Sequence, residues 1–271
     1  MIHGAPGSDT PATLSKAALS VLLEPNAAGK VERTRAYAAA WSDHRITEIG
    51  RSHPPDRPAR PARPELRPPR DMPKRRKGGA AGRAAFVHAI AHIELNAIDL
   101  AWDIVVRFTG EAMPEAFYDD WVGVASDEAE HFAMLAGRLA DLGSAYGDLP
   151  AHDGLWQAAA DTADDLLARL AVVPMILEAR GLDTTPGAVQ RLTEAGDGET
   201  AAILETIGRE EIPHVAAGVR WFEFLCDRRG MEPVATFRHL ARSRFNGVIK
   251  PPFNRAARDA AGMPEPYYAA A

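Results

Sequence analysis

Four long stretches of helical periodicity each place a glutamate in the middle of their apolar face. The stretches cover residues 80–108, about 114–142, about 155–180 and about 197–227. The positions one helical turn from each glutamate are mostly aliphatic or aromatic, which is the pattern of a face turned toward a core. The glutamates are Glu94, Glu128, Glu178 and Glu211. Burying a carboxylate is costly unless it is paired or binds a cation, so this feature restricts the fold more than any other.

Two of these glutamates are followed three residues later by a histidine on the same face. The stretch DEAEHF pairs Glu128 with His131, and EEIPHV pairs Glu211 with His214. Side chains at positions i and i+3 of a helix share a face, so both members of each pair can reach one ion. The two Glu-x-x-His pairs are therefore candidate metal-ligand pairs.

The order of the candidate ligands repeats along the chain. A lone glutamate precedes each pair by 34 residues (94 to 128) and 33 residues (178 to 211). A bundle with a pseudo-twofold axis would bring six ligands together: Glu94, Glu128, His131, Glu178, Glu211 and His214. Carboxylates can bridge two ions while each histidine binds one, so the set predicts a pair of iron or manganese ions. The alternative is a buried polar network without metal.

Other polar residues near the glutamates are interpreted as lying outside the ligand set. Asp99 and Asp183 each follow a lone glutamate by five residues and are expected to orient the histidines through hydrogen bonds. His88 and His92 lie off the Glu94 stripe and are expected behind the ligands or at the surface. Glu130, Glu205 and Glu210 fall on more polar faces and are interpreted as solvated or as neighbours of the ligands.

The glycine- and proline-containing segments between the helical stretches predict an all-α fold, a four-helix bundle with one long crossover. RGLDTTPG (180–187) is expected to close the third helix, with a short helix around 186–195 after it. One or two helices are expected within 12–44, and an irregular tail over 242–268. The predicted segments are an N-terminal helical extension (1–50), a Pro/Arg-rich strap (51–79), the dimetal bundle (80–228) and a C-terminal extension that packs on the bundle (229–271).

The strap is dense in proline and arginine and is expected to be extended. The favoured interpretation is a segment packed on the bundle surface. A basic arm for nucleic acid and a disordered segment are the alternatives.

Composition favours a cytoplasmic protein. The single cysteine, Cys226, excludes an internal disulfide framework and suits a reducing compartment. The first residues lack the basic and apolar regions of a signal peptide, and no apolar run approaches the length of a membrane span. The net charge of −6 does not indicate a particular kind of binding partner.

The ligand order, with two lone glutamates and two Glu-x-x-His pairs, resembles the ferritin-like di-iron carboxylate superfamily over residues 80–228. Over nearly the whole chain, the sequence is similar to an uncharacterised bacterial ferritin-like family, a domain of unknown function. The shared stretches are HAIAHIELNAIDLAWD, DEAEHF, EARGLDTTPG, AGDGETAAIL, EEIPHV, RWFEFLC, PPFN and RPELRPPRDMPKR.

This resemblance implies two Fe ions as cofactor, with manganese or a mixed Mn/Fe pair as the other options. It favours an oxidase or oxygenase that uses O2 or peroxide and an external electron donor. It does not identify the substrate, which could be a small molecule or RNA. A homodimer is also compatible with the resemblance. The alternatives are a metal-stabilised scaffold and a ferroxidase or iron-handling protein.

Two prolines lie next to the expected ligands. Pro213 is inside the second Glu-x-x-His pair, and Pro174 is one turn before Glu178. A proline inside a helix removes one backbone hydrogen bond, so both helices are predicted to bend at these positions.

Overall fold

Helices provide the regular structure of the part of the chain that is described, residues 10–72 and 79–269 of a computed structural model. Within these residues there is no strand, only an isolated parallel bridge between Leu66 and Ala151. The all-α prediction is thus confirmed. None of the helices in the described ranges combines the length and the apolar character needed to cross a membrane.

The chain divides into two compact units, 1–61 with 97–129 and 62–96 with 130–271. Helix α3 (Gly79–Arg107) and helix α4 (Glu115–Asp141) are continuous and contribute to both units. Their bounds lie within one residue of the predicted 80–108 and 114–142.

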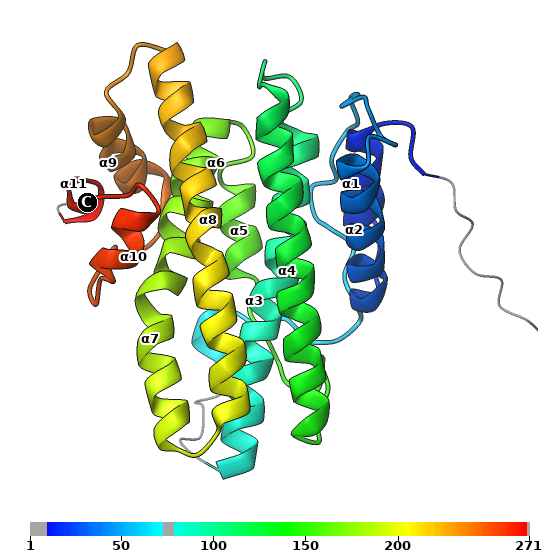
Figure 1. Cartoon of the computed structure of the whole chain (residues 1–271), viewed down its shortest axis with the longest axis vertical. Coiled ribbons are helices and arrows are strands. Elements are labelled where there is room, and N and C mark those ends of the chain that lie inside the picture. Colours follow the sequence, from blue (N-terminus) through cyan, green and yellow to red (C-terminus); the bar gives the residue numbers. More distant parts are fainter. Residues whose placement is uncertain (1–9, 73–78, 270–271) are drawn as a thin grey trace, which may run out of the picture. The chain divides into compact units, whose positions relative to one another are not determined.

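In the first unit, α1 (Leu14–Leu22) and α2 (Ala27–Ser42) lie side by side (Figure 1). Each begins at a capping side chain, because Thr13 accepts a hydrogen bond from the backbone N–H of Lys16 and Asn26 accepts one from Gly29. These caps explain why two helices form within the predicted range 12–44.

Polar groups from α2 tie this helix to the second half of α3. The Nζ atom of Lys30 lies 2.6 Å from Oδ1 of Asp99, and both side chains are buried. The indole N–H of Trp102 donates to the hydroxyl of Thr34 at 2.9 Å. Burying a polar group is costly unless it finds a hydrogen-bond partner, and these pairs supply the partners.

The second unit contains the remaining helices, and α7 and α8 lie side by side in it (Figure 1). Their bounds are α5 Gly154–Ala160, α6 Leu166–Val172, the π-helical turn η2 Val173–Glu178, α7 Ala179–Glu194, α8 Gly198–Arg228, α9 Pro233–Arg244, α10 Arg255–Ala260 and α11 Glu265–Tyr268. A short 3-10 turn, η1, covers Pro69–Asp71.

The third predicted helix, 155–180, begins where expected, at α5, but is wrong in its interior and at its C-terminal end. It is interrupted between α5 and α6, where the buried side chain of Arg169 donates to the carbonyl of Ala159 and to the hydroxyl of Thr162. The first bond satisfies a carbonyl at the end of α5, and the second holds the turn that follows it, so the chain can turn inside the core.

At its C-terminal end, the third predicted helix does not stop at RGLDTTPG. Helix α7 continues through Pro186 to Glu194, so the separate short helix at 186–195 is also wrong. Pro186 cannot donate to the carbonyl of Leu182, four residues earlier. The side-chain amide of Asn254 donates to this carbonyl instead, at 3.2 Å. A distant residue therefore compensates for the missing bond.

The regular α-helical pattern is interrupted at Pro174, where the chain forms the π-helical turn η2; the bend itself stays a prediction. π-Helical turns inside helices frequently occur at functional sites. Helix α8 continues as an α-helix on both sides of Pro213, so a bend there stays a prediction.

The C-terminal tail is irregular over 245–254, as expected, but α10 and α11 after it are helical, which corrects the expectation for these residues. Glu232 caps α9 by accepting hydrogen bonds from the backbone N–H groups of Val234 and Ala235, and Asn254 caps α10. Arg258 of α10 is buried and forms two hydrogen bonds with Asp183 of α7, at 2.8 and 2.7 Å. Asn254 follows the N-cap preference for short polar residues, whereas Glu232 reaches the same backbone donors with a longer side chain.

Residues 51–72 of the strap are extended apart from η1, as predicted. Within the first unit, the N–H of Ala59 donates to the carbonyl of Leu22. Within the second unit, the N–H of Ala151 donates to the carbonyl of Glu65, and the carbonyl of Ala151 accepts from the N–H of Arg67. This arrangement agrees with a packed strap for these residues. Residues 73–78, which complete the basic part of the strap, lie outside the described residues.

Candidate metal centre

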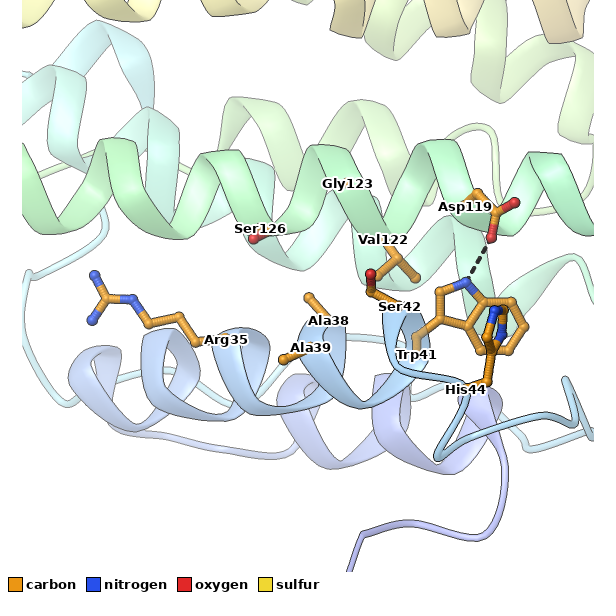
Figure 2. A pocket seen from close by; sticks show the side chains of 10 residues that line it. All are labelled: Arg35, Ala38, Ala39, Trp41, Ser42, His44, Asp119, Val122, Gly123 and Ser126. Carbon is orange, nitrogen blue, oxygen red and sulfur yellow. Dashed lines mark hydrogen bonds between the residues drawn. The ribbon is translucent and has the colours of Figure 1, made fainter.

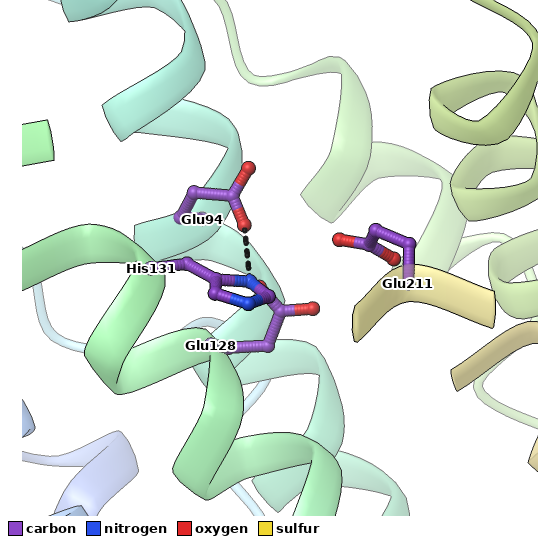
Figure 3. Close-up of side chains that lie close together, drawn as sticks. All are labelled: Glu94, Glu128, His131 and Glu211. Atoms are coloured by element: carbon purple, nitrogen blue, oxygen red, sulfur yellow. Dashed lines mark ion pairs between the residues drawn. The ribbon is translucent and has the colours of Figure 1, made fainter. Parts of the chain in front are cut away.

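Three helices bring four of the six predicted ligands together (Figure 3). Helix α3 supplies Glu94, α4 supplies Glu128 and His131, and α8 supplies Glu211. One potential ligand atom from each residue lies within 4.8 Å of those of the others, and all four side chains are buried. Glu128 stands one turn before His131 on the continuous helix α4. A buried cluster of this kind could hold a metal ion.

The two ring nitrogens of His131 have different neighbours. Nε2 lies 3.0 Å from Oε2 of Glu210, whereas Nδ1 lies 3.4 Å from Oε2 of Glu94 (Figure 3). Both neighbours are carboxylates; in the neutral tautomer that donates from Nε2 to Glu210, Nδ1 presents its lone pair to the cluster. In this tautomer the ring could bind a metal ion through Nδ1 while a carboxylate holds its outer nitrogen.

Charge makes this cluster unstable without a cation. Three carboxylates and one imidazole share a space from which water is excluded, with exposures of 3% for Glu94, 0% for Glu128 and 8% for Glu211. Like charges this close repel each other strongly in a medium of reduced dielectric constant. A bound cation, or protonation of the carboxylates, removes this repulsion.

The donor atoms also fit a first-row metal. Carboxylate oxygens and an imidazole nitrogen suit iron, manganese and zinc, whereas a soft site would require thiolates. Cys226 is buried elsewhere on α8, and burial raises the pKa of its thiol to about 11. The donor set therefore fits the predicted class of metal without selecting one member of it.

The other two predicted ligands, Glu178 and His214, lie outside the 4.8 Å group. His214 is buried, its Nδ1 is 3.4 Å from Oε2 of Glu211, and its ring centre is 5.9 Å from that of His131. Glu178 ends the π-helical turn η2 and is half-buried.

Close packing holds the π-helical turn against α8. A Cβ atom added to Gly218 of α8 would come within 2.5 Å of Cβ of Pro174. Only a glycine permits this approach of the Pro174 ring to the backbone of α8. The turn that carries Glu178 is therefore fixed against the helix that carries Glu211 and His214.

The two aspartates that were expected to orient the histidines, Asp99 and Asp183, have other partners. Asp99 is paired with Lys30, and Asp183 is paired with Arg258. At 100° per residue, a position five residues after a glutamate points roughly 140° away from it. The expectation that these aspartates orient the histidines is therefore wrong. Glu210, expected to be solvated or a neighbour of the ligands, contacts His131 directly.

His88 and His92 are buried and bind the loop after α4, so the surface interpretation is wrong. The backbone N–H of Gly147 donates to Nε2 of His88 at 3.0 Å, and Nδ1 of His92 lies 2.8 Å from the hydroxyl of Tyr146. Burial lowers the pKa of His88, which keeps the ring neutral and able to accept this bond. Sequence periodicity gave no signal for this contact because the loop is rich in glycine and polar residues.

The all-α fold and the buried glutamate–histidine cluster define a helical protein with a candidate metal site. The chain belongs to the family described as protein of unknown function DUF455, whose profile matches residues 23–269. It is 41% identical over 208 residues to an uncharacterized protein of Haemophilus influenzae, which covers 75% of this chain and 72% of that protein. No solved structure matches the chain. Membership of an uncharacterised family is thus confirmed, whereas the ferritin-like relationship stays a prediction.

Proposed function

We propose that the chain is a ferritin-like dimetal oxidoreductase that uses O2 or peroxide to oxidise a substrate. The observation that supports this proposal most is the convergence of Glu94, Glu128, His131 and Glu211 from three helices within 4.8 Å. Four-helix carboxylate sites of this composition hold pairs of iron or manganese ions. The substrate, a small molecule or RNA, and the electron donor are further predictions.

In this proposal, Glu94, Glu128, His131 and Glu211 hold the ions, and His214 and Glu178 complete the set. The four glutamates carry four negative charges, which balance two divalent ions. When bound, a pair of iron ions supplies electrons and open coordination positions for reaction with O2. A site neutral in this state tolerates burial better than one that keeps an excess charge.

The residues around the ligands have two tasks. Glu210 fixes the ring of His131 by accepting the Nε2 proton at 3.0 Å. Buried apolar side chains on the same face of α4, Trp121, Ala125 and Phe132, exclude water from the carboxylates. Together they maintain the orientation of the ligands.

The reaction with oxygen tests this function. Anaerobic protein loaded with ferrous iron is mixed with O2 in a stopped-flow spectrometer, and excess ferrous iron is then added. We expect one rapid oxidation of the bound pair and no further iron uptake. Glu205→Gln is a matched control, because Glu205 is an exposed residue of α8 and its variant should react like the wild type.

Two outcomes contradict the proposal. Sustained oxidation of many added iron equivalents would identify an iron-storage or ferroxidase protein. Protein that binds iron but does not react with O2 or with peroxide would identify a metal-stabilised scaffold.

A further inference from the structure

A surface cavity of about 580 Å³ lies between α2 and the first half of α4, within the first compact unit (Figure 2). This volume falls in the range of small-molecule sites, roughly 300–1,000 Å³. Gly123 and Ser126 line it from α4. At 100° per residue they point roughly 140° and 160° away from Glu128, so the cavity and the candidate metal ligand use opposite faces of this helix.

The middle of the cavity is lined by small side chains. Ala38 and Ala39 come from α2 and Gly123 from α4, and none of them carries a polar side-chain atom (Figure 2). Small residues on two neighbouring helices leave room between them for an apolar group. Transfer of such a group from water into the cavity is favourable, because it removes apolar surface from water.

One end of the cavity carries a positive charge. Figure 2 shows Arg35 at this end, with Trp41, His44 and Asp119 at the other. The planar guanidinium group forms paired hydrogen bonds with carboxylate or phosphate. Six residues of helix separate Arg35 from Trp41, a rise of about 9 Å at 1.5 Å per residue.

The opposite end is negative. The indole N–H of Trp41 donates to Oδ1 of Asp119 at 2.8 Å, which fixes the orientation of this carboxylate at the cavity. Helix α2 ends here, at Ser42, and the carbonyl groups of a helix C-terminus carry a partial negative charge. His44, which follows, has a φ of 55°, an uncommon conformation for a residue other than glycine. This end therefore favours a cationic hydrogen-bond donor.

We propose that this cavity binds a small organic zwitterion, with its anionic group at Arg35, its ammonium group at Asp119 and an apolar chain between them. The proposal does not depend on the metal centre. It rests on the separation of the two charges along one groove and on the small side chains between them.

The test uses three probes of matched length: 8-aminooctanoate, octanoate and octylamine. Full-length protein is labelled with ¹⁵N in tryptophan, and the indole signal of Trp41 is identified by its loss in Trp41→Phe. This N–H donates to Asp119 at the cavity, so its resonance reports occupancy directly. We expect 8-aminooctanoate to shift the Trp41 signal at a concentration about tenfold lower than octanoate or octylamine, because it forms both charged contacts.

Variants locate the binding groups. Arg35→Gln should weaken 8-aminooctanoate and octanoate about tenfold and leave octylamine unchanged. Gly123→Leu should prevent binding of all three probes by filling the centre. Arg45→Gln is the control, because Arg45 is exposed, pairs with Asp43 and does not line the cavity. The proposal is overturned if none of the probes shifts the Trp41 signal at millimolar concentration, or if Arg35→Gln binds 8-aminooctanoate as tightly as the wild type.

Discussion

Glu128→Gln is expected to stabilise the metal-free protein and to destabilise the metal-loaded protein. In the absence of metal, Glu128 is one of three carboxylates crowded in a buried cluster, so removing its charge relieves repulsion by about 1–3 kcal/mol. In the presence of metal, the same change removes a ligand. The sign of the effect on unfolding free energy should therefore reverse between the two conditions.

Thermal denaturation with and without a chelator measures this reversal. Metal at a thousand times its dissociation constant stabilises the folded state by about 4 kcal/mol, which corresponds to a Tm increase of about 10 °C for a chain of this size. We expect the wild type to lose this increase on chelation and Glu128→Gln to lose only a small part of it. A variant that is less stable than the wild type under both conditions would instead support a buried polar network without metal.

Lys30→Met is expected to lower the free energy of unfolding by about 3–5 kcal/mol, because it leaves the charge of Asp99 buried without its cation. Both side chains are buried and their charged atoms are 2.6 Å apart. Burial already raises the pKa of Asp99, and Lys30 opposes this effect. The double variant Lys30→Met/Asp99→Leu should recover most of the loss, because it removes both charges together.

The loss in Lys30→Met should also depend on pH in a defined direction. Without Lys30 the pKa of Asp99 in the folded state rises further above its unfolded value, so between these values the folded state binds more protons than the unfolded state. Stability then falls as pH rises. Urea denaturation should show a larger deficit at neutral pH than near pH 5. A deficit below about 1 kcal/mol at neutral pH would contradict the prediction.

Periodicity was sufficient to predict the helices that carry the cluster, because a glutamate in an apolar stripe is visible in the sequence. Glu94, Glu128, His131 and Glu211 were found in this way. The prediction failed where distant residues decide the local structure. Pro186 reads as a helix end, and only the contact between Asn254 and the carbonyl of Leu182 allows α7 to continue through it.

The partners of buried charges were the least predictable part of the site. The spacing of Asp99 and Asp183 from the lone glutamates suggests contacts with the histidines, but their cations, Lys30 and Arg258, lie 69 and 75 residues away in the sequence. Helical geometry alone could have excluded the assignment, because positions i and i+5 point in different directions. Glu210 could be placed near His131 only after α4 and α8 were packed together.

Elemental analysis of protein purified from cells grown in iron-supplemented medium tests the dimetal site most directly. We expect a pair of first-row metal ions per chain in the wild type and in the exposed-residue control Glu205→Gln, and less than about a tenth of this content in Glu128→Gln/Glu211→Gln, which removes two ligands. Wild-type protein with fewer than one ion per chain, or a double variant that keeps its metal, would contradict the assignment of these residues as a dimetal centre.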